Sequence, residues 1–467
     1  MSRLITVSNR VAIPRDDGKA AGGLTVGVMA ALKEHGGIWF GWNGRTTESE
    51  PHDPQLKTDG NITYATINLN RREFEAYYNG FSNDTLWPLF HYLLGFFHFD
   101  RQNFEAYMRV NALFARKLVP LLRPDDIIWV HDYHLIPLAA ELRRAGVTQP
   151  IGFFLHVPFP DYDVLRALPD HEYLIRSLCS YDVVGFHTQR DLHSFQECVT
   201  QPLAGGHVLT DGHVRAFGRR LRTDVYPIGI DVDQCAHMAD AHADDGAVDR
   251  LRSSLHGRRL MIGVDRLDYS KGLPERFRAY ERLLEHYPGN RKQVVLMQIA
   301  PPTRTGVRTY AEIREELEGI AGHINGRFAE VDWVPLRYLN KGYDRGLLMA
   351  IYRLARVGVV TPVRDGMNLV AKEYVAAQNP DDPGALVLST LAGAARELDA
   401  AVLVNPYDTD GVAAGMQKAL EMPLAERLER HDDMLRILRR NDINTWRTRF
   451  VSHLQAAGDG TRRAVDD

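Results

Sequence analysis

The stretch "VGVVTPVRDGMNLVAKEY", Val357 to Tyr374, places a cluster of polar residues between an apolar run and a helical pattern. The run "VGVVTP" is short and rich in β-branched residues, which predicts a strand buried on both faces. Asp365, Gly366 and Asn368 lie between this strand and the helix. A turn needs only a glycine and one cap, and such a cap contributes about 1 kcal/mol. The surplus of polar groups indicates a binding role for this junction.

The same alternation of strand and helix runs along the whole chain. Apolar strands that are each followed by a helix predict parallel sheets covered on both faces, the doubly wound α/β class. We predict two Rossmann-like domains, 1–231 and 232–442. We expect a final helix within 443–467 to cross back to the first domain and to end in a frayed tail. Strands are predicted at 3–9, 37–42, 61–69, 126–132, 151–157, 182–188, 259–265, 293–300, 328–335, 357–363, 385–389 and 401–406.

The bulk composition narrows the class of protein. The 467 residues include 56 Lys and Arg against 60 Asp and Glu, a net charge of −4 without the basic excess typical of nucleic-acid binding. The three cysteines lie far apart, which argues against a disulfide framework or a zinc site. The N-terminus lacks the apolar region of a signal peptide, and no apolar run approaches the roughly 18 residues of a spanning helix. We expect a cytoplasmic protein with no membrane or nucleic-acid partner.

Polar residues at the carboxyl ends of the predicted strands are the candidates for a site. Ligands bind at those ends in open parallel sheets, and with two such domains we expect a cleft between them. In "VDRLDYSKGLPERF", residues 264–277, Arg266 and Lys271 follow a strand and Gly272 precedes a helix. Charge-assisted bonds from such cations to phosphate contribute roughly 1.5–3 kcal/mol each. This loop is predicted to bind an anion, and both cations together suit a diphosphate.

Carboxylates and a glycine pair add to this picture. Asp365 and Glu373 could hold sugar hydroxyls, which donate to anionic oxygens. Gly22 and Gly23 open a helix beside the first strand, where backbone N–H groups could approach a phosphate or sugar, although a glycine pair by itself favours a plain turn. The pair does not match G-x-G-x-x-G, which argues against a dinucleotide-dependent dehydrogenase.

Histidines follow two predicted strands. In "WVHDYHLIP", His131 and His134 have the i, i+3 spacing of metal ligands, with Asp132 between them. No third ligand with motif spacing stands out, so a hydrogen-bonding or structural role is favoured over a metal. His156 ends a buried strand and fits either a core histidine or a polar contact at the floor of a cleft.

Aromatic residues accompanied by arginines suggest a sugar phosphate as ligand. Rings pack on the apolar face of a sugar, and the guanidinium fork grips phosphate. Arg10, Tyr78, Trp87 and the two arginines in "APPTRTGVR", Arg304 and Arg308, fit this combination. Taken singly, Tyr78 and Trp87 fit ordinary core packing better than a binding role.

Several of these stretches together resemble one enzyme family. "VSNR", "AGGL", "WFGWNG", "YYNGFSN", "WVHDYHL", "GFFLHVPFP", "VYPIGID", "DRLDYSKGLPERF", "QIAPPTR", "RDGMNLVAKEYVA" and "VNPYD" occur here in the order found in the trehalose-6-phosphate synthases, glycosyltransferase family 20. The resemblance runs from near residue 2 to about residue 447 and implies the GT-B fold. It implies transfer of glucose from UDP-glucose to glucose 6-phosphate with retention, giving α,α-trehalose 6-phosphate and UDP. It also implies no cofactor, no metal, small-molecule substrates and a homo-oligomer, either a dimer or a tetramer.

The resemblance assigns roles by motif position. The implied catalytic residues are Arg266, Lys271, Asp365 and His156. The implied donor residues are Gly22, Gly23, Arg266, Lys271, Tyr343, Asp365, Gly366, Met367, Asn368, Leu369, Val370, Ala371 and Glu373, with Glu373 on the ribose. The implied acceptor residues are Arg10, Trp42, Tyr78, Trp87, Asp132 and Arg304, where Trp39 competes with Trp42 for its place. Lys372 receives no role; a solvated side chain is one interpretation of it, and the sequence does not decide.

Two alternatives stay open at this point. A glucosylglycerol-phosphate synthase shares much of the architecture and differs in the acceptor pocket. A catalytically silent homologue would sense a sugar phosphate without turnover. The nucleotide of the donor is a further open choice, because UDP-, GDP- and ADP-glucose share the diphosphate that Arg266 and Lys271 would bind.

Overall fold

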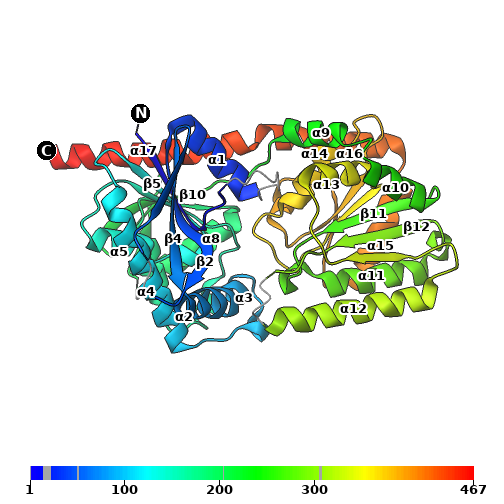
Figure 1. Ribbon diagram of the computed structural model, residues 1–467, viewed down its shortest axis with the longest axis horizontal. Helices are drawn as coiled ribbons and strands as arrows, with labels where there is room; N and C mark the ends of the chain where they lie inside the picture. The colour runs from blue at the N-terminus through cyan, green and yellow to red at the C-terminus, as the bar shows by residue number, and fades with distance from the viewer. Residues whose placement is uncertain (1, 14–22, 50–51, 203, 304–307, 467) are drawn as a thin grey trace. The chain divides into compact units, whose positions relative to one another are not determined.

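The chain forms two compact units, each built around one β-sheet (Figure 1). The structure is a computed structural model that describes residues 2–13, 23–49, 52–202, 204–303 and 308–466. Unit 1 comprises Met1–Pro227 together with Asn444–Asp467, and unit 2 comprises Ile228–Ile443. The chain therefore passes between the units twice, after Pro227 and after Ile443. The doubly wound α/β class predicted from the sequence is confirmed in both units.

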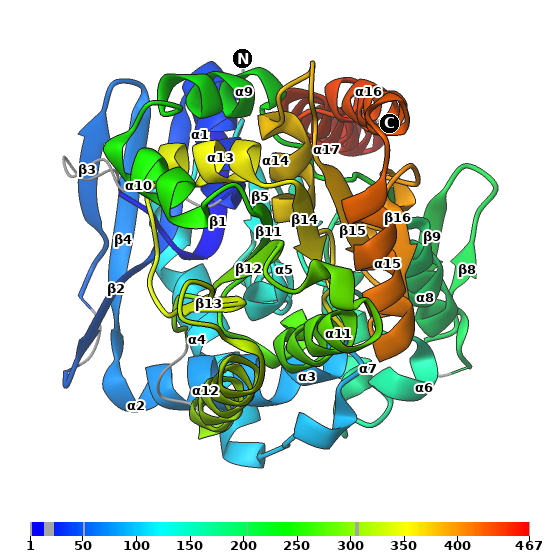
Figure 2. The same ribbon diagram turned by 90° about the vertical axis from the view of Figure 1, so that its right-hand side faces the viewer.

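Unit 1 has a largely parallel sheet with the strand order β3-β4-β2-β1-β5-β6-β7-β10-β9-β8. Figure 2 shows β3 and β8 at its opposite edges, where the antiparallel pairs β3–β4, β9–β10 and β8–β9 lie. Its elements are β1 (Leu4–Arg10), α1 (Gly23–His35), β2 (Gly37–Thr47), β3 (Gln55–Asp59), β4 (Ile62–Asn70), α2 (Arg71–Phe74), η1 (Glu75–Leu86), α3 (Trp87–Phe90), η2 (Leu94–Phe96), α4 (Arg101–Leu118), η3 (Val119–Leu121), β5 (Ile127–His131), η4 (Tyr133–Leu135), α5 (Leu138–Arg144), β6 (Ile151–Phe154), α6 (Tyr162–Leu165), α7 (His171–Leu178), β7 (Val183–Phe186), α8 (Gln189–Thr200), β8 (His207–Val208), β9 (His213–Ala216) and β10 (Arg219–Val225).

Unit 2 has a six-stranded parallel sheet with the order β13-β12-β11-β14-β15-β16. Figure 1 shows α9, α13 and α14 on one face of this sheet and α11, α12 and α15 on the other. Its elements are α9 (Val232–Ala241), α10 (Gly246–Leu255), β11 (Arg259–Val264), η5 (Tyr269–Lys271), α11 (Leu273–His286), η6 (Pro288–Asn290), β12 (Val294–Ile299), α12 (Arg308–Phe328), β13 (Leu336–Leu339), α13 (Arg345–Leu354), β14 (Val357–Val360), α14 (Leu369–Ala377), β15 (Ala385–Ser389), η7 (Gly393–Arg396), β16 (Val402–Val404), α15 (Thr409–Glu421) and α16 (Leu424–Arg440).

One predicted strand is misplaced. The sequence pattern favoured a strand at 328–335, but β13 begins at Leu336. In the predicted segment, Trp333 forms an isolated bridge with Glu330 and donates from Nε1 to the Val294 carbonyl at 2.8 Å. Trp333 lies in a turn, but its side chain is buried. Its apolar character therefore led to the wrong prediction of a strand.

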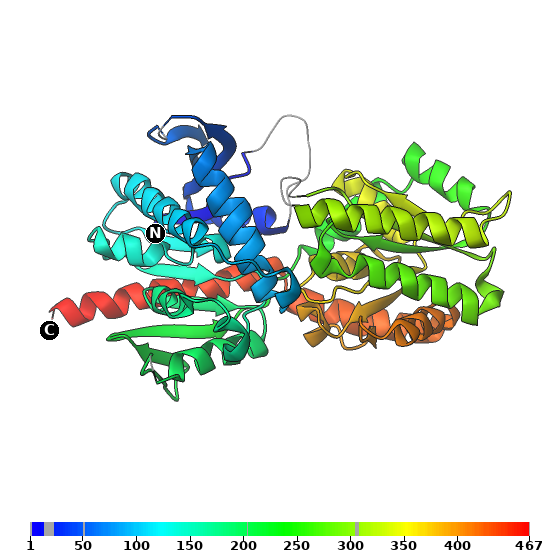
Figure 3. The ribbon, with the colours of Figure 1, turned by 90° about the horizontal axis from the view of Figure 1, so that it is seen from below.

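The last helix, α17 (Ile443–Asp466), packs on the first sheet. Trp446 and Phe450 lie 4.9 and 4.8 Å from the ring of Trp129 on β5, measured between ring centroids. Gly152 and Gly185 make room for Phe450, because a Cβ at either glycine would lie within 3 Å of that ring. Figure 3 shows α17 lying along the strands, and it continues through the stretch for which we expected a frayed tail.

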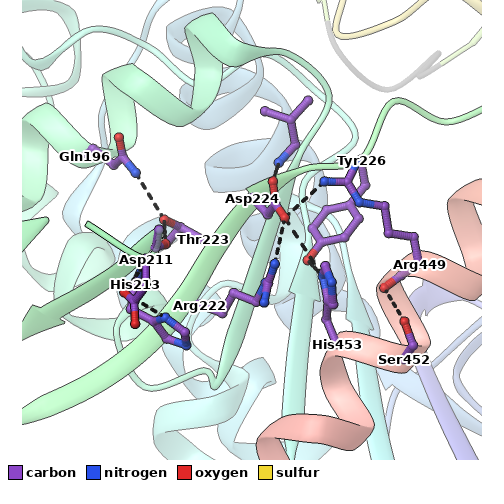
Figure 4. A network of polar contacts seen from close by, with 12 residues as sticks. Gln196, Asp211, His213, Arg222, Thr223, Asp224, Tyr226, Arg449, Ser452 and His453 are labelled. Atoms are coloured by element: carbon purple, nitrogen blue, oxygen red, sulfur yellow. Dashed lines mark hydrogen bonds and ion pairs between the residues drawn. The ribbon is translucent and has the colours of Figure 1, made fainter. Parts of the chain in front are cut away.

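Polar contacts reinforce this attachment (Figure 4). The Asp224 carboxylate lies 3.1 Å from Arg449 and 3.9 Å from His453, both on α17. The Tyr226 hydroxyl and His453 Nδ1 are 2.7 Å apart. Residues distant in sequence by more than two hundred positions are thus joined within unit 1.

Within the part of the chain that the structure describes, no helix is long and apolar enough to cross a membrane. The three cysteines, Cys179, Cys198 and Cys235, are free and buried.

Candidate functional site

Each sheet has a switch point, where the chain changes the direction in which it adds strands. In unit 2 the point lies between the parallel neighbours β11 and β14, and in unit 1 it lies between β1 and β5. Loops diverge from the carboxyl ends of the strands there, which leaves room for a ligand. Most of the predicted site residues that the structure describes follow these four strands or their neighbours.

The loop after β11 carries the two predicted cations. Lys271 is largely buried and donates from Nζ to Asp365 Oδ2 at 2.5 Å. Arg266 is more open, with 47% of its side chain exposed and its guanidinium 3.9 Å from Asp268. Gly272 follows at φ 64°, and a Cβ there would lie 2.6 Å from the Thr361 carbonyl oxygen. The glycine therefore permits this loop to approach the loop that follows β14.

The loop after β14 divides its polar residues between two tasks. Asn368 caps α14, because its side-chain oxygen accepts from the Ala371 N–H at 3.2 Å. Asp365 does not cap; it accepts from Lys271 and, at 3.0 Å, from the Asn368 amide. Asn368 has φ 77°, a conformation that asparagine tolerates better than most residues. One of the polar groups that a simple turn would not need, the Asp365 carboxylate, thus forms an ion pair with Lys271 of the neighbouring loop.

A buried arginine that sequence reasoning missed supports both loops. Arg276 on α11 is fully buried and donates to Asp265 at 2.6 Å and to Gln298 at 2.7 Å. It also donates to the Thr361 hydroxyl at 3.0 Å, and so ties the ends of β11, β12 and β14 together. The signal in the sequence is an arginine on the apolar face of a helix, next to Phe277 in "PERF".

The other predicted donor residues lie around the start of α14. Glu373 accepts from Arg345 at 3.0 Å, and its burial raises the pKa of the carboxyl group while the arginine opposes that shift. Tyr343 is half-buried, with the Lys341 ammonium 5.1 Å from its ring centroid. The assignment of Glu373 to a ribose stays a prediction, as do the roles of Gly366, Met367, Leu369, Val370 and Ala371.

The structure decides the environment of Lys372, which the sequence left open. Its side chain is fully buried. The ammonium donates to Glu397 at 2.5 Å and to the Ile228 carbonyl at 2.8 Å. Burial lowers the pKa of Lys372, and Glu397 opposes this. The periodicity of α14 could not predict this burial, because the partners come from distant parts of the chain.

In unit 1 the predicted acceptor residues form a continuous row. The Arg10 guanidinium lies 5.7 Å from the ring centroid of Trp42, and Trp42 lies 6.2 Å from Tyr78. Tyr78 stacks on His134 with 5.7 Å between the rings. Trp39, the competitor of Trp42, is buried and donates to Ser8, which places it in the core.

Asp132 and His156 continue the row just beyond the neighbouring strands β5 and β6. The Asp132 carboxylate accepts from the His156 N–H at 3.2 Å and lies 4.0 Å from His134. The backbone of Asp132 has φ 76°, and such a conformation costs a residue other than glycine about 1–3 kcal/mol. Strain of this kind gathers at functional sites. Trp87 is buried, with its ring 5.8 Å from that of Tyr133, and its acceptor role stays a prediction.

His156 has a histidine as its partner. Its Nε2 lies 3.1 Å from Nδ1 of His131, and burial lowers the pKa of both rings well below the ordinary value. Both rings are therefore neutral at pH 7. Among the residues that the structure describes, no three or more His, Cys, Asp or Glu side chains form a group that could hold a metal ion.

Two predicted residues, Gly22 and Arg304, lie outside the described residues, and Gly23 is the first residue of α1. Their roles stay predictions.

Comparison with known proteins shows the family to which the chain belongs. A sequence model described as glycosyltransferase family 20 matches residues 3–456. The chain belongs to glycosyltransferase family 20. A trehalose-6-phosphate synthase of the family from Klebsiella pneumoniae is 51% identical over 455 residues, covering 97% of this chain and 95% of the relative. The family resemblance drawn from the sequence is confirmed.

Two solved structures extend the comparison. An α,α-trehalose-phosphate synthase (UDP-forming) from Burkholderia xenovorans, in complex with glucose-6-phosphate, superposes with a TM-score of 0.94 at 54% identity, covering 97% of this chain and 100% of that one. An E. coli structure described as trehalose-6-phosphate, bound with UDP-2-fluoro glucose, gives a TM-score of 0.93 at 50% identity, covering 97% and 99%. The predicted GT-B fold of two Rossmann-like domains is confirmed for this member of the family.

Proposed function

We propose that the protein is a retaining glucosyltransferase that moves glucose from UDP-glucose to glucose 6-phosphate, giving α,α-trehalose 6-phosphate and UDP. Membership of glycosyltransferase family 20 over nearly the whole chain supports this reaction. So do the relatives solved with glucose-6-phosphate and with UDP-2-fluoro glucose. The observation that carries the proposal is the meeting of Lys271 and Asp365, 2.5 Å apart, at the switch point of the second sheet.

The chemistry of that pair fits a nucleotide sugar. Lys271 and Arg266 are placed to neutralise a diphosphate, whose oxygens accept charge-assisted hydrogen bonds. Asp365 is an acceptor only when it is ionised, and so it suits the hydroxyls of the transferred glucose. Because the two groups bond one another, a bound donor exchanges their mutual contact for contacts with phosphate and sugar.

The row in unit 1 fits a hexose phosphate as acceptor. Arg10 supplies a guanidinium fork for the phosphate, and Trp42 and Tyr78 supply rings for the sugar face. Asp132 supplies a carboxylate for the sugar hydroxyls. A glycerol phosphate has no ring to cover these aromatic surfaces, so glucose 6-phosphate is the better fit.

The proposed mechanism needs no nucleophile from the protein. The bond from the glucose C1 to the diphosphate oxygen breaks, and the electron pair leaves with UDP. The acceptor hydroxyl attacks C1 on the same face, and its proton passes to the departing phosphate oxygen. The residues contribute by positioning and by neutralising charge.

An assay of the purified protein tests the proposal. UDP-, GDP- and ADP-glucose are each combined with glucose 6-phosphate and with glycerol 3-phosphate, and nucleotide release is followed together with NMR of the product. We expect turnover with UDP-glucose and glucose 6-phosphate, and an α,α-linked product. Turnover with glycerol 3-phosphate alone would assign the alternative synthase, and absence of turnover in every pair would leave only a sensor.

The homo-oligomer that was expected from the sequence stays a prediction. Light scattering on the purified protein measures the mass directly.

A further inference from the structure

The buried ammonium of Lys372 lies at the centre of a network that the reaction does not account for. Its two partners are the carbonyl of Ile228, the first residue of unit 2, and the carboxylate of Glu397. The other oxygen of Glu397 accepts from the Asn441 amide at 2.8 Å. We call Lys372, Glu397, Asn441 and the Ile228 carbonyl the Lys372 network.

The network reaches both segments through which the chain passes between the units. Ile228 follows the first passage, and Asn441 stands two residues before Ile443, where unit 2 ends. The segments are also joined directly, since Ile443 donates its N–H to the Ile230 carbonyl at 3.2 Å. A Cβ at Gly229 would lie 2.1 Å from the Asn441 carbonyl oxygen, so only glycine allows this approach. We call 228–231 and 440–443 the connecting segments.

At its other end the network reaches the loop that is proposed to bind the donor. The segment before Glu397 pairs with that loop: Gly393 donates to the Asp365 carbonyl at 3.1 Å, and Ala394 to the Met367 carbonyl at 2.8 Å. Asp365 in turn donates its N–H to the Leu391 carbonyl at 3.2 Å. Lys372 itself lies in the first turns of α14, four residues after the cap Asn368. Contiguous hydrogen bonds therefore run from Asp365 to the connecting segments.

Burying a charge is costly unless its partners compensate, and here Glu397 and the Ile228 carbonyl offset part of that cost. Lys372 is fully buried and the side chain of Glu397 is 9% exposed. Apolar side chains of the same size would anchor α14 as firmly, so stability alone does not require an ion pair in this place. An ion pair fixes direction and distance, which is the property a positioning device needs.

We propose that Lys372 is a positioning residue whose network couples the donor-binding loop at Asp365 to the two connecting segments. Binding of a nucleoside diphosphate beside Asp365 then changes the order of residues 228–231 and 440–443. This inference rests on the proposed function, because it takes the donor to bind at Asp365.

Hydrogen exchange on the full-length protein, with and without UDP, tests the coupling. In the wild type we expect UDP to slow exchange in 365–371 and in both connecting segments. In Lys372→Met, which keeps a long unbranched side chain without the ammonium, slowing at 365–371 persists and slowing in the connecting segments is lost. Slowing that is equal in the two proteins, or confined to 365–371 in the wild type, would overturn the inference. No slowing at 365–371 in the wild type would instead remove the donor assignment, and the coupling with it.

A matched control and a second variant secure the interpretation. Arg427 is also a buried cation of unit 2, bonded to Asp382 and to the Met422 carbonyl, and Arg427→Met should keep the wild-type pattern of exchange. Asn441→Ala removes only the amide at the far end of the network and carries the test if Lys372→Met fails to fold. The expected result for it is loss of UDP-dependent slowing in 440–443, and retention would count against the inference.

Kinetics supply an independent readout. Substitutions along a coupling network change affinity roughly 2- to 30-fold, so we expect a drop of that size in kcat/KM for UDP-glucose in Lys372→Met and in Asn441→Ala. The double variant should lose no more than the worse single variant, because the two residues act in one network. Multiplicative losses would show two independent effects and contradict the coupling.

Discussion

Residues at the switch point of unit 2 that are proposed to bind the donor also form ion pairs with other residues of the protein. Lys271 and Asp365 are the clearest case, since each is proposed to bind the donor and each bonds the other at 2.5 Å. Arg266 differs, because almost half of its side chain is open to solvent. Removing Lys271 should therefore disturb the neighbouring loop more than removing Arg266 does. The loss of kcat/KM for UDP-glucose should be similar in the two variants.

Replacement of Lys271 or Arg266 by alanine should lower kcat/KM for UDP-glucose by about 30- to 150-fold, the equivalent of one charge-assisted phosphate contact of ~2–3 kcal/mol. The measurement is steady-state kinetics with glucose 6-phosphate held saturating. Arg278 is the matched control, because it is an arginine of the adjacent helix with the same exposure, 47%, and an ion pair to Glu316. Near-normal kcat/KM in either of the first two variants would refute their assignment.

The neutral histidines in unit 1 predict a pH dependence of stability. Burial lowers the pKa of His131 and His156 in the folded protein, so below about pH 6.5 the unfolded chain binds more protons than the folded one. Their contribution is fully present above the unfolded pKa and is lost as the pH falls. Each histidine contributes a slope of up to about 1.4 kcal/mol per pH unit in this window.

His131→Gln should therefore flatten the loss of unfolding free energy between pH 7 and pH 5, measured by urea denaturation. The exposed His193 gives the control variant, His193→Gln, for which the wild-type slope is expected. An unchanged slope in His131→Gln would show that His131 becomes protonated in the folded protein.

At the scale of elements, the donor loop depends on a second segment that lies beside it. Residues 391–394 pair with 365–367, and an isolated parallel bridge joins Asp365 to Ala392. The approach is so close at Gly393 that a Cβ would lie 1.9 Å from the Gly366 carbonyl oxygen. A backbone atom has no alternative rotamer, so this contact cannot be relieved without moving the loop.

Gly393→Ala should displace the loop of Asp365, with a cost of about 1–3 kcal/mol or more from overpacking, and should weaken UDP binding in calorimetry. Gly289→Ala is the control, because a Cβ there meets nothing within 4 Å. Wild-type UDP affinity in Gly393→Ala would mean that the pairing with 391–394 does not position the donor loop.

At the scale of the whole molecule, the first unit is completed only by the end of the chain. The ring of Phe450 fills the space above Gly152 and Gly185 and stacks on Trp129 at 4.8 Å. Residues 444–467 belong to unit 1 although the whole of unit 2 precedes them in sequence. The core of unit 1 is therefore incomplete until the last helix has been synthesised.

Phe450→Ala should destabilise unit 1 by about 3–5 kcal/mol, the usual cost of removing a buried aromatic side chain. Urea denaturation followed by tryptophan fluorescence measures it, since Trp129 and Trp446 adjoin the cavity that is created. Ser452→Ala on the exposed side of the same helix should change stability by less than about 0.5 kcal/mol. Equal effects of the two substitutions would show that α17 does not support the core.

Local patterns were enough to predict much of this molecule. The β-branched apolar runs and the helices between them predicted parallel sheets. Arg266, Lys271 and Asp365, which were predicted to lie at strand ends, follow β11 and β14, and their role in binding stays a prediction. These features depend on neighbours in the sequence, because strand burial and helix caps are set within about ten residues. The misplaced strand at 328–335 shows the limit, since Trp333 packs like a strand residue while lying in a turn.

Contacts between distant segments decided the rest. The sequence left the environment of Lys372 undecided, and only the folded chain brings Glu397 and the Ile228 carbonyl to its ammonium. Only the folded chain likewise brings Asp265, Gln298 and Thr361, from the ends of three strands, within hydrogen-bonding distance of Arg276. The sequence by itself determined the sheets, the helices and the strand ends at which binding groups gather. The tertiary structure decided which of those groups are paired and buried, because the free energy of a buried charge depends on partners that come from elsewhere in the chain.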